Sequence, residues 1–173
     1  MEEFLMKKII YVLLILMLLS ITACTTPQKE EPPSPQETEV TLYYANKVYV
    51  ETGDESLEKL VPIKRLIPTG EGLHMTMLNE LKKAPDENDV STELLPDITF
   101  LGVEIENNIA RVNISSKNLN GGSLQEFFVM NQIIYTLTDL EDIDQVQFLV
   151  DGEIAESLMG HYSADKPLGR NEV

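Results

Sequence analysis

Few side chains in this 173-residue sequence have the type and spacing that chemistry requires. The two histidines are His74 and His161, and neither has a second histidine or a glutamate at the spacing of a zinc site. We therefore predict no metal at either residue. His161 lies between Gly160 and Tyr162 after the last predicted strand, and we interpret it as a structural residue that ties the tail to the sheet.

Ser123 follows Gly121 and Gly122 at a predicted helix start, which faintly resembles a nucleophile elbow. The G-x-S-x-G pattern fails at Gln125, and the glycines lack the Gly-Lys-Ser/Thr ending of a phosphate loop. Glu126 instead stands three residues after Ser123, the spacing of a capping box, in which both side chains satisfy free backbone donors. The sequence therefore predicts a helix cap, with no catalytic or cofactor-binding residue.

Carboxylates cluster after this helix at Asp139, Glu141, Asp142 and Asp144. Such oxygens are ligands for calcium, but the cluster lacks the spacing and central glycine of a calcium loop. A solvated loop is the favoured interpretation, and calcium binding stays open. No cofactor is predicted.

Cys24 is the only cysteine, which excludes an intrachain disulfide and a cysteine-based metal site. It ends the run I-T-A-C, which follows Lys7, Lys8 and eleven unbroken apolar residues at 9–19. That run is about half of the roughly 20 residues that a spanning helix needs, so it favours a secretion signal. The I-T-A-C run resembles the lipobox of bacterial lipoproteins, which implies cleavage before Cys24 and a diacylglyceryl group on its sulfur.

We therefore expect residues 1–23 to be a lipoprotein signal peptide and Cys24 to be a lipid anchor in the cell membrane, facing the extracytoplasmic side. Two acyl chains make a stable anchor. Residues 25–39 hold four of the nine prolines and no aliphatic or aromatic residue. Together with Cys24 they form a predicted Pro/Glu-rich linker, 24–39, with a reach of up to roughly 50 Å.

The net charge of −16 belongs to the mature part, because Glu2, Glu3, Lys7 and Lys8 cancel in the leader. A surface this acidic argues against nucleic acid, whose phosphates need lysine and arginine. It equally argues against lying flat on an anionic membrane.

Alternating apolar residues predict strands at 40–45, 60–67, 99–106, 109–114 and 146–150, and helical spacing predicts helices at 72–83 and over about four turns from Ser123. Residues 46–47 are expected to turn, 48–50 to be extended and 86–96 to be a polar loop. Hairpin turns are expected at 107–108 and 151–152, and Pro62 confines its strand to an edge or a strand start. The predicted fold is α+β: one mixed β-sheet with two α-helices on one face, formed by two β-α-β units joined by a hairpin.

Several runs in this order resemble the GerMN domain of sporulation and spore germination lipoproteins. The clearest are V-T-L-Y-Y-A-N, L-G-V-E-I-E-N-N-I-A-R-V-N-I-S-S, N-G-G-S and V-Q-F-L-V-D-G-E. The resemblance runs from about residue 40 to 170, so residues 40–173 are expected to form one such domain. It implies a compact module related to ring-building motifs, acting outside the cytoplasmic membrane, with no catalytic residues to carry over. The best-known member has two copies and serves the channel between mother cell and forespore, so that specific role does not transfer directly.

These observations predict a protein that is not an enzyme but an envelope-anchored module that takes part in protein assembly, linked to sporulation or germination. Its expected partners are envelope or membrane proteins, through its sheet or edge strands, and a homo-oligomer is possible. The alternative is a lipoprotein that senses a small cationic ligand or a metal and reports to a membrane partner. An envelope hydrolase would need an acid–base pair that the sequence does not display.

Overall fold

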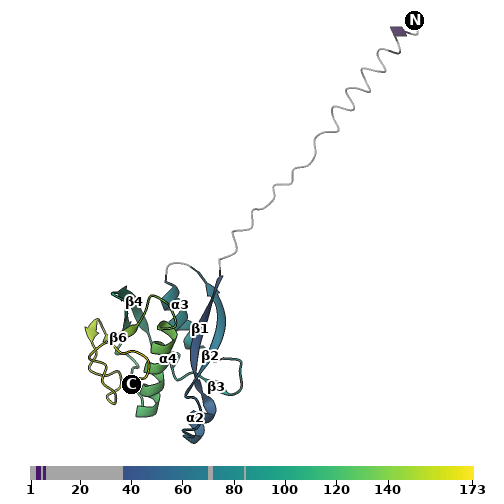
Figure 1. Ribbon diagram of the computed structural model, residues 1–173. Helices are drawn as coiled ribbons and strands as arrows, with labels where there is room; N and C mark the ends of the chain where they lie inside the picture. Colours follow the sequence, from purple (N-terminus) through teal and green to yellow (C-terminus); the bar gives the residue numbers. More distant parts are fainter. Residues whose placement is uncertain (1–2, 5, 7–36, 70–71, 84) are drawn as a thin grey trace. The chain divides into compact units, whose positions relative to one another are not determined.

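Helices and strands follow one another along residues 37–173 largely in the predicted order. The computed structural model describes residues 3–4, 6, 37–69, 72–83 and 85–173 (Figure 1). The strands are β1 (Glu37–Asn46), β2 (Leu60–Pro68), β3 (Val90–Ser91), β4 (Phe100–Glu106), β5 (Ile109–Ile114), β6 (Gln145–Val150) and β7 (Glu153–Ile154). The helices are α2 (Lys47–Thr52), α3 (Leu73–Leu81) and α4 (Ser123–Leu137).

The chain divides into two units, residues 1–34 and 35–173, and every element named here belongs to the second. The predicted apolar leader run, Cys24 and most of the linker lie outside the described residues. Strand β1 begins at Glu37, so the last three residues of the predicted linker belong to the folded unit. Of the helices in the described part of the chain, none has the length and apolarity to cross a membrane.

Backbone hydrogen bonds divide the strands into two sheets, in the orders β2-β1-β3 and β4-β5-β6-β7. The larger sheet is mixed, because β5 and β6 are parallel whereas its other pairs are antiparallel. Helix α4 connects the parallel strands, so β5-α4-β6 is one of the predicted β-α-β units. The second unit is not formed, since β2 and β4 flank α3 but lie in different sheets.

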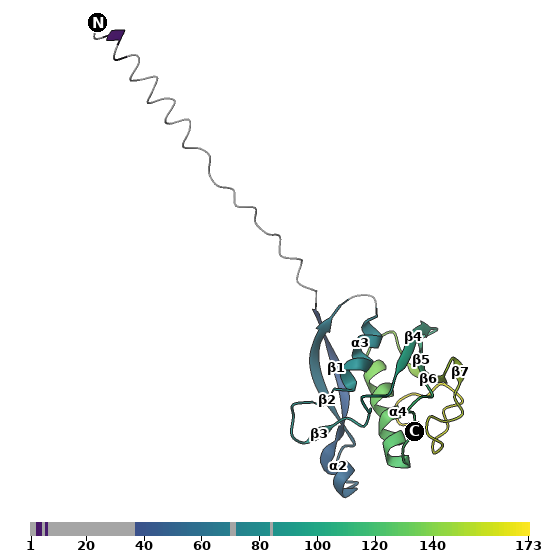
Figure 2. The same cartoon turned by 180° about the vertical axis from the view of Figure 1, so that it is seen from behind.

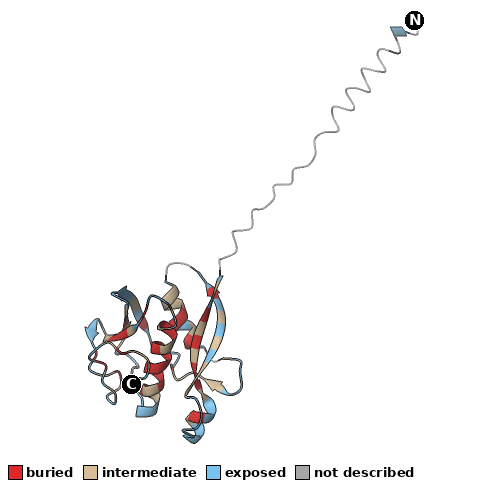
Figure 3. Cartoon of the chain, viewed as in Figure 1, coloured by how far each residue is buried: buried red, intermediate tan, exposed pale blue. Residues whose placement is uncertain are grey.

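The α+β class is confirmed, as is a mixed sheet that carries both helices on one face. Figures 1 and 2 show α3 and α4 between the two sheets, and both helices contact strands of each sheet. The prediction of a single sheet was wrong in this detail because most residues of α4 are buried, and Figure 3 shows the middle of the helix largely red. A helix buried all round needs cover on two sides, and β1 supplies the second cover with Val40, Leu42 and Tyr44.

Two polar residues on α4 complete the contact with β1. Gln132 and Thr136 are buried and lie four residues apart, so they share one face of the helix. The Tyr43 N–H donates to Thr136 Oγ1 over 2.9 Å, and Gln132 Nε2 donates to the Tyr43 carbonyl over 3.3 Å. Helix side chains thus satisfy partly buried backbone groups of Tyr43 on the side of β1 that faces away from β2.

Helix α2 replaces the extended piece that was predicted at residues 48–50. The Asn46 side chain accepts hydrogen bonds from the N–H groups of Val48 and Tyr49, which caps the helix start. Gly53 ends the helix in the left-handed conformation, with φ of 66°. The predicted loop at 86–96 likewise contains the short strand β3, which pairs with the end of β1.

Both predicted hairpin turns are present. Asn107 and Asn108 have φ of 52° and 61°, as a two-residue type I′ turn requires. Strand β4 has an irregularity between Phe100 and Gly102, so Phe100 takes the inner position opposite Ile114. Leu101 was predicted to share a face with the following apolar residues of the strand, but the bulge leaves it 50% exposed.

Candidate binding groove

A stripe of three side chains on α4 forms one wall of an open groove of about 680 Å³. Phe127, Asn131 and Tyr135 follow one another at intervals of four residues, which places them on one side of the helix. The Asn131 side chain donates to the Phe127 carbonyl over 2.8 Å, so its amide belongs to the wall itself. The remaining lining residues are Tyr43, Glu55, Ser56, Leu57, Glu58, Lys59, Leu60, Pro62, Asn171 and Val173.

The other walls come from distant parts of the sequence. Tyr43 and Pro62 are partners across β1 and β2, and β2 is an edge strand, as Pro62 predicted. The loop at 55–59 and the tail at 171–173 close the sides. Tyr135 Oη donates to Asn171 Oδ1 over 2.9 Å and so fastens the tail to the helix.

Lys59 is one of the residues that line the groove, and other residues of the protein already contact its ammonium group. Its Nζ stands 5.3 Å from the ring centroid of Tyr49 and 5.1 Å from that of Phe127. It also pairs with Glu55 over 3.6 Å. Cation–π contacts and the ion pair thus hold Lys59 against the wall of the groove. The neighbouring Glu58, by contrast, makes no ion pair with any described residue.

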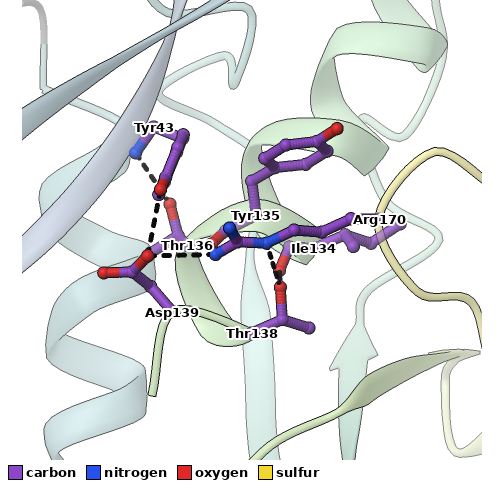
Figure 4. Close-up of polar contacts among 7 residues, drawn as sticks. All are labelled: Tyr43, Ile134, Tyr135, Thr136, Thr138, Asp139 and Arg170. Carbon is purple, nitrogen blue, oxygen red and sulfur yellow. Dashed lines mark hydrogen bonds and ion pairs between the residues drawn. The ribbon is translucent and has the colours of Figure 1, made fainter. Parts of the chain in front are cut away.

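Arg170 is held in a second cluster that shares two tyrosines with the groove (Figure 4). Its guanidinium carbon lies 5.1 Å from the ring centroid of Tyr43 and 5.0 Å from that of Tyr135. It donates to Thr138 Oγ1, to the Tyr135 carbonyl and to Asp139 Oδ1 over 2.9–3.0 Å. The planar arginine therefore fixes both tyrosine rings at the groove by stacking and hydrogen bonding together.

Asp139 is the acidic partner in this cluster. It accepts hydrogen bonds from Tyr43 Oη over 2.9 Å and from Arg170. Burial acts to raise the pKa of Asp139, but hydrogen bonds from Arg170, Thr41 and Tyr43, with the charge of Arg170, outweigh it and lower the pKa. Burial and the bond to Asp139 raise the pKa of the Tyr43 phenol.

This role of Asp139 alters the interpretation of the acidic cluster. Asp139 is committed to Arg170, and Glu141, Asp142 and Asp144 are exposed. Within the described ranges, no group of three or more histidine, cysteine or acidic residues is placed to hold a metal ion. Calcium binding by the four carboxylates therefore gains no support from their geometry.

Glu126 has a role that the capping-box prediction missed. The N-cap of α4 is Gly122 without a side-chain hydrogen bond, so Ser123 is simply the first residue of the helix and not its cap. Glu126 is fully buried. Its Oε1 accepts from the N–H groups of Leu158 and Met159 over 2.9 and 2.8 Å, and its Oε2 accepts from the His161 N–H over 2.8 Å.

The carboxylate of Glu126 is thus the anchor of the loop at 158–161. His161 takes part through its backbone, while its ring Nε2 lies 3.3 Å from the Gly121 carbonyl. The tail is therefore tied to the start of α4 at His161, and to the sheet by the bridge between Val146 and Leu168. His74 lies half-exposed on α3, and no hydrogen bond joins its side chain to another described residue. Cys24, the predicted lipidation site, lies outside the described residues.

Several of these contacts could not be predicted from short-range patterns in the sequence. Arg170 and Asp139 are 31 positions apart, and Glu126 and His161 are 35 apart, so no spacing rule connects them. Gln132 and Thr136 did leave a signal, since they are polar residues four apart in the mainly apolar second half of the helix.

Comparison with known proteins agrees with this fold. The family model described as sporulation and spore germination, Germane, matches residues 41–156. The first GerMN domain of the sporulation protein GerM from Bacillus subtilis superposes with a TM-score of 0.63 at 19% identity, covering 78% of this chain and 99% of that domain. The tandem GerMN domains of GerM give a TM-score of 0.62 at 19% identity, covering 83% of this chain and 49% of the tandem.

A candidate lipoprotein from Clostridium perfringens is also similar, with a TM-score of 0.53 and 25% identity over 78% of this chain and 88% of that one. No curated protein sequence matches the chain. The family match covers about two thirds of the sequence, and the structural matches share the fold. The chain therefore belongs to the Germane (GerMN) family of sporulation and spore germination domains.

Proposed function

We propose that this protein is a lipid-anchored, non-catalytic module that binds a partner protein of the cell envelope and so takes part in an assembly linked to sporulation or germination. The groove carries the proposal. Its walls combine aromatic and aliphatic side chains with polar ones, and the cations near it, Lys59 and Arg170, are held in ion pairs and against rings. Such a surface can bind a partner at a low cost in side-chain ordering, because its cations are fixed before the partner arrives, while Glu58 is left to pair with a cation of the partner.

The lining of the groove indicates the chemistry of its occupant. Phe127 and Tyr135 offer ring surface to an apolar or aromatic side chain. Among the charged lining residues, Glu55 and Glu58 outnumber Lys59. The occupant is therefore an extended segment of a partner protein that carries an apolar anchor beside a lysine or arginine. The overall charge of −16 attracts such a segment over a distance.

A position in the envelope is supported by two observations. The I-T-A-C sequence ending at Cys24 resembles a lipobox, and a candidate lipoprotein is among the similar structures. In this proposal the Pro/Glu-rich sequence before β1 serves as a spacer between the lipid anchor and the folded unit.

The non-catalytic role is supported by what the residues with reactive side chains do. Ser123 begins α4 with no base within the described residues bonded to its hydroxyl, and His161 secures a loop. Glu126, the buried carboxylate, has its oxygens occupied by backbone donors. The Glu126 carboxylate is therefore used to hold the structure together.

Photo-crosslinking in membranes tests the proposal. A photoreactive phenylalanine analogue replaces Glu58 at the groove or, as a matched control, Glu141, an exposed glutamate that does not line it. We expect a defined envelope protein to crosslink to position 58 and not to position 141. Repeated absence of a product at position 58, or the same products from both positions, would contradict binding through the groove.

The same groove supports a second candidate, the sensing of a small cationic molecule. Its volume of about 680 Å³ is within the range of small-ligand sites, and aromatic walls accommodate organic cations. Calorimetry of the full-length protein with spermidine and with calcium separates the two functions. Micromolar binding of spermidine that Glu58→Lys abolishes would favour sensing, whereas no heat agrees with a protein partner.

A further inference from the structure

Strand β4 is a second candidate surface, and it shares no residue with the groove. It is the terminal strand of the larger sheet, as Figures 1 and 2 show. Within the described part of the chain, β5 is the only element joined to β4 by backbone hydrogen bonds. One edge of a seven-residue strand therefore remains open.

The hairpin turn determines which backbone groups face that open edge. In a two-residue type I′ hairpin the residues next to the turn, Glu106 and Ile109, form a hydrogen-bonded pair. Because the pairs alternate along an antiparallel ladder, Glu104 also directs its N–H and C=O towards β5. Val103 and Ile105 then direct theirs outward, where a further strand can pair with them.

Edge strands that avoid pairing with other chains usually carry charged residues, whereas β4 also exposes apolar side chains. Leu101 is 50% and Ile105 37% exposed. A bulge at Leu101 and two glutamates do discourage unspecific pairing. Gly102 has no side chain to cover the edge, and the space beside it is open, since a Cβ there would meet no atom within 4 Å. The edge therefore combines open backbone groups and exposed apolar side chains with negative charge.

The negative charge of β4 determines which kind of strand pairs favourably with its open edge. Glu104 and Glu106 are exposed on the same face of β4, and among the described residues Glu106 has a cationic partner, Arg111 at 3.1 Å, whereas Glu104 has none. A second copy of this chain paired through β4 would set these glutamates against their own counterparts, and like charges across a ladder are destabilising. A strand with lysine or arginine at alternate positions gains attraction there instead.

We propose that β4 accepts an extended, basic segment of a partner protein as an added strand of the larger sheet. The segment pairs its backbone with Val103 and Ile105, places its basic side chains beside Glu104 and Glu106, and covers Ile105 with its alternate apolar side chains. Main-chain hydrogen bonds supply affinity and the alternating side chains supply specificity, as in other cases of strand addition.

Hydrogen exchange on the full-length protein in phosphatidylcholine nanodiscs tests this, since these lipids carry no net charge to attract the probe. The probe is the capped peptide K-V-K-V-K. Its controls are E-V-E-V-E and a K-V-K-V-K peptide with N-methylated backbone amides, which cannot donate to a strand. We expect the lysine peptide to slow exchange of the Val103 and Ile105 amides at least about tenfold, a change equivalent to one net hydrogen bond.

Two variants sharpen the result. Glu104→Lys should weaken binding of the lysine peptide, and Ile105→Pro should abolish it while the pairing of β4 with β5 is kept, because only an outward N–H is removed. Unchanged exchange at Val103 and Ile105 would overturn the proposal. So would equal slowing by the N-methylated peptide, equal binding to Glu104→Lys, or slowing without peptide that grows with protein concentration. Crosslinking at the groove does not depend on any of these results.

Discussion

Replacing Glu126 with glutamine exchanges a buried carboxylate, whose two oxygens both accept hydrogen bonds, for an amide with one acceptor oxygen and one donor nitrogen. The wild-type carboxylate accepts three backbone N–H groups from Leu158, Met159 and His161 over 2.8–2.9 Å. A glutamine keeps one acceptor oxygen, and its amide nitrogen must face at least one of these donors. Glu126 is fully buried and its hydrogen bonds to Leu158, Met159 and His161 are buried or partly buried, so water has little access to the donor that is left.

The magnitude follows from these contacts. A buried donor without a partner costs about 1–3 kcal/mol, and exchange of a charged acceptor for a neutral one weakens each remaining bond by roughly 0.5–1 kcal/mol. With one donor unpaired and two bonds weakened, we expect Glu126→Gln to lower the free energy of unfolding by about 2–5 kcal/mol. Glu141→Gln, at an exposed position, should change it by less than about 0.5 kcal/mol.

Urea unfolding of the full-length protein in detergent, followed by circular dichroism, measures this difference. The midpoint should fall while the dependence of the free energy on urea stays the same. Hydrogen exchange should also become faster at Leu158, Met159 and His161. A Glu126→Gln protein as stable as Glu141→Gln, with unchanged exchange at these amides, would refute the anchoring role of the carboxylate.

Three further predictions concern other contacts. Asn46→Ala removes the cap of α2 and should lower the free energy of unfolding by about 1 kcal/mol in the same assay. Asp139→Asn should be less stable than wild type at neutral pH. Because the folded-state pKa of Asp139 is lowered, its contribution is present above about pH 4 and is lost as the pH falls through the folded pKa. Unfolding measured from pH 7 to pH 2 should show the two proteins converge, and a constant gap would contradict the ion pair with Arg170. Cys24→Ser should leave the membrane fraction on sedimentation, and unchanged retention would defeat the lipid anchor.

Local patterns in the sequence predicted most of the elements. The apolar stripe after Ser123 gave α4, alternation gave β1, β2, β4, β5 and β6, and Asn107-Asn108 gave a hairpin turn. Each of these signals depends on neighbouring residues, so it can be recognised in the sequence. Asn46 was also a recognisable cap, but its helix of six residues is too short to show a period.

The features that failed depend on contacts between distant residues. The capping box assigned Glu126 to its nearest backbone donors, whereas its actual partners lie 32–35 positions away. The two sheets could not be distinguished from one because strand alternation shows which face is buried and not which strand is adjacent. The groove is formed jointly by Tyr135, the loop at 55–59 and the tail. No sequence motif connects these three parts of the chain.

Charge reversal at the groove tests partner binding most directly. The crosslinked envelope protein is purified, and its affinity is measured for wild type, Glu58→Lys and the matched control Glu141→Lys, all full-length in nanodiscs. Since one charge contact of about 1.4 kcal/mol is worth tenfold in affinity, Glu58→Lys should bind at least about tenfold more weakly, with Glu141→Lys close to wild type. Equal affinities for all three proteins would contradict binding through the groove.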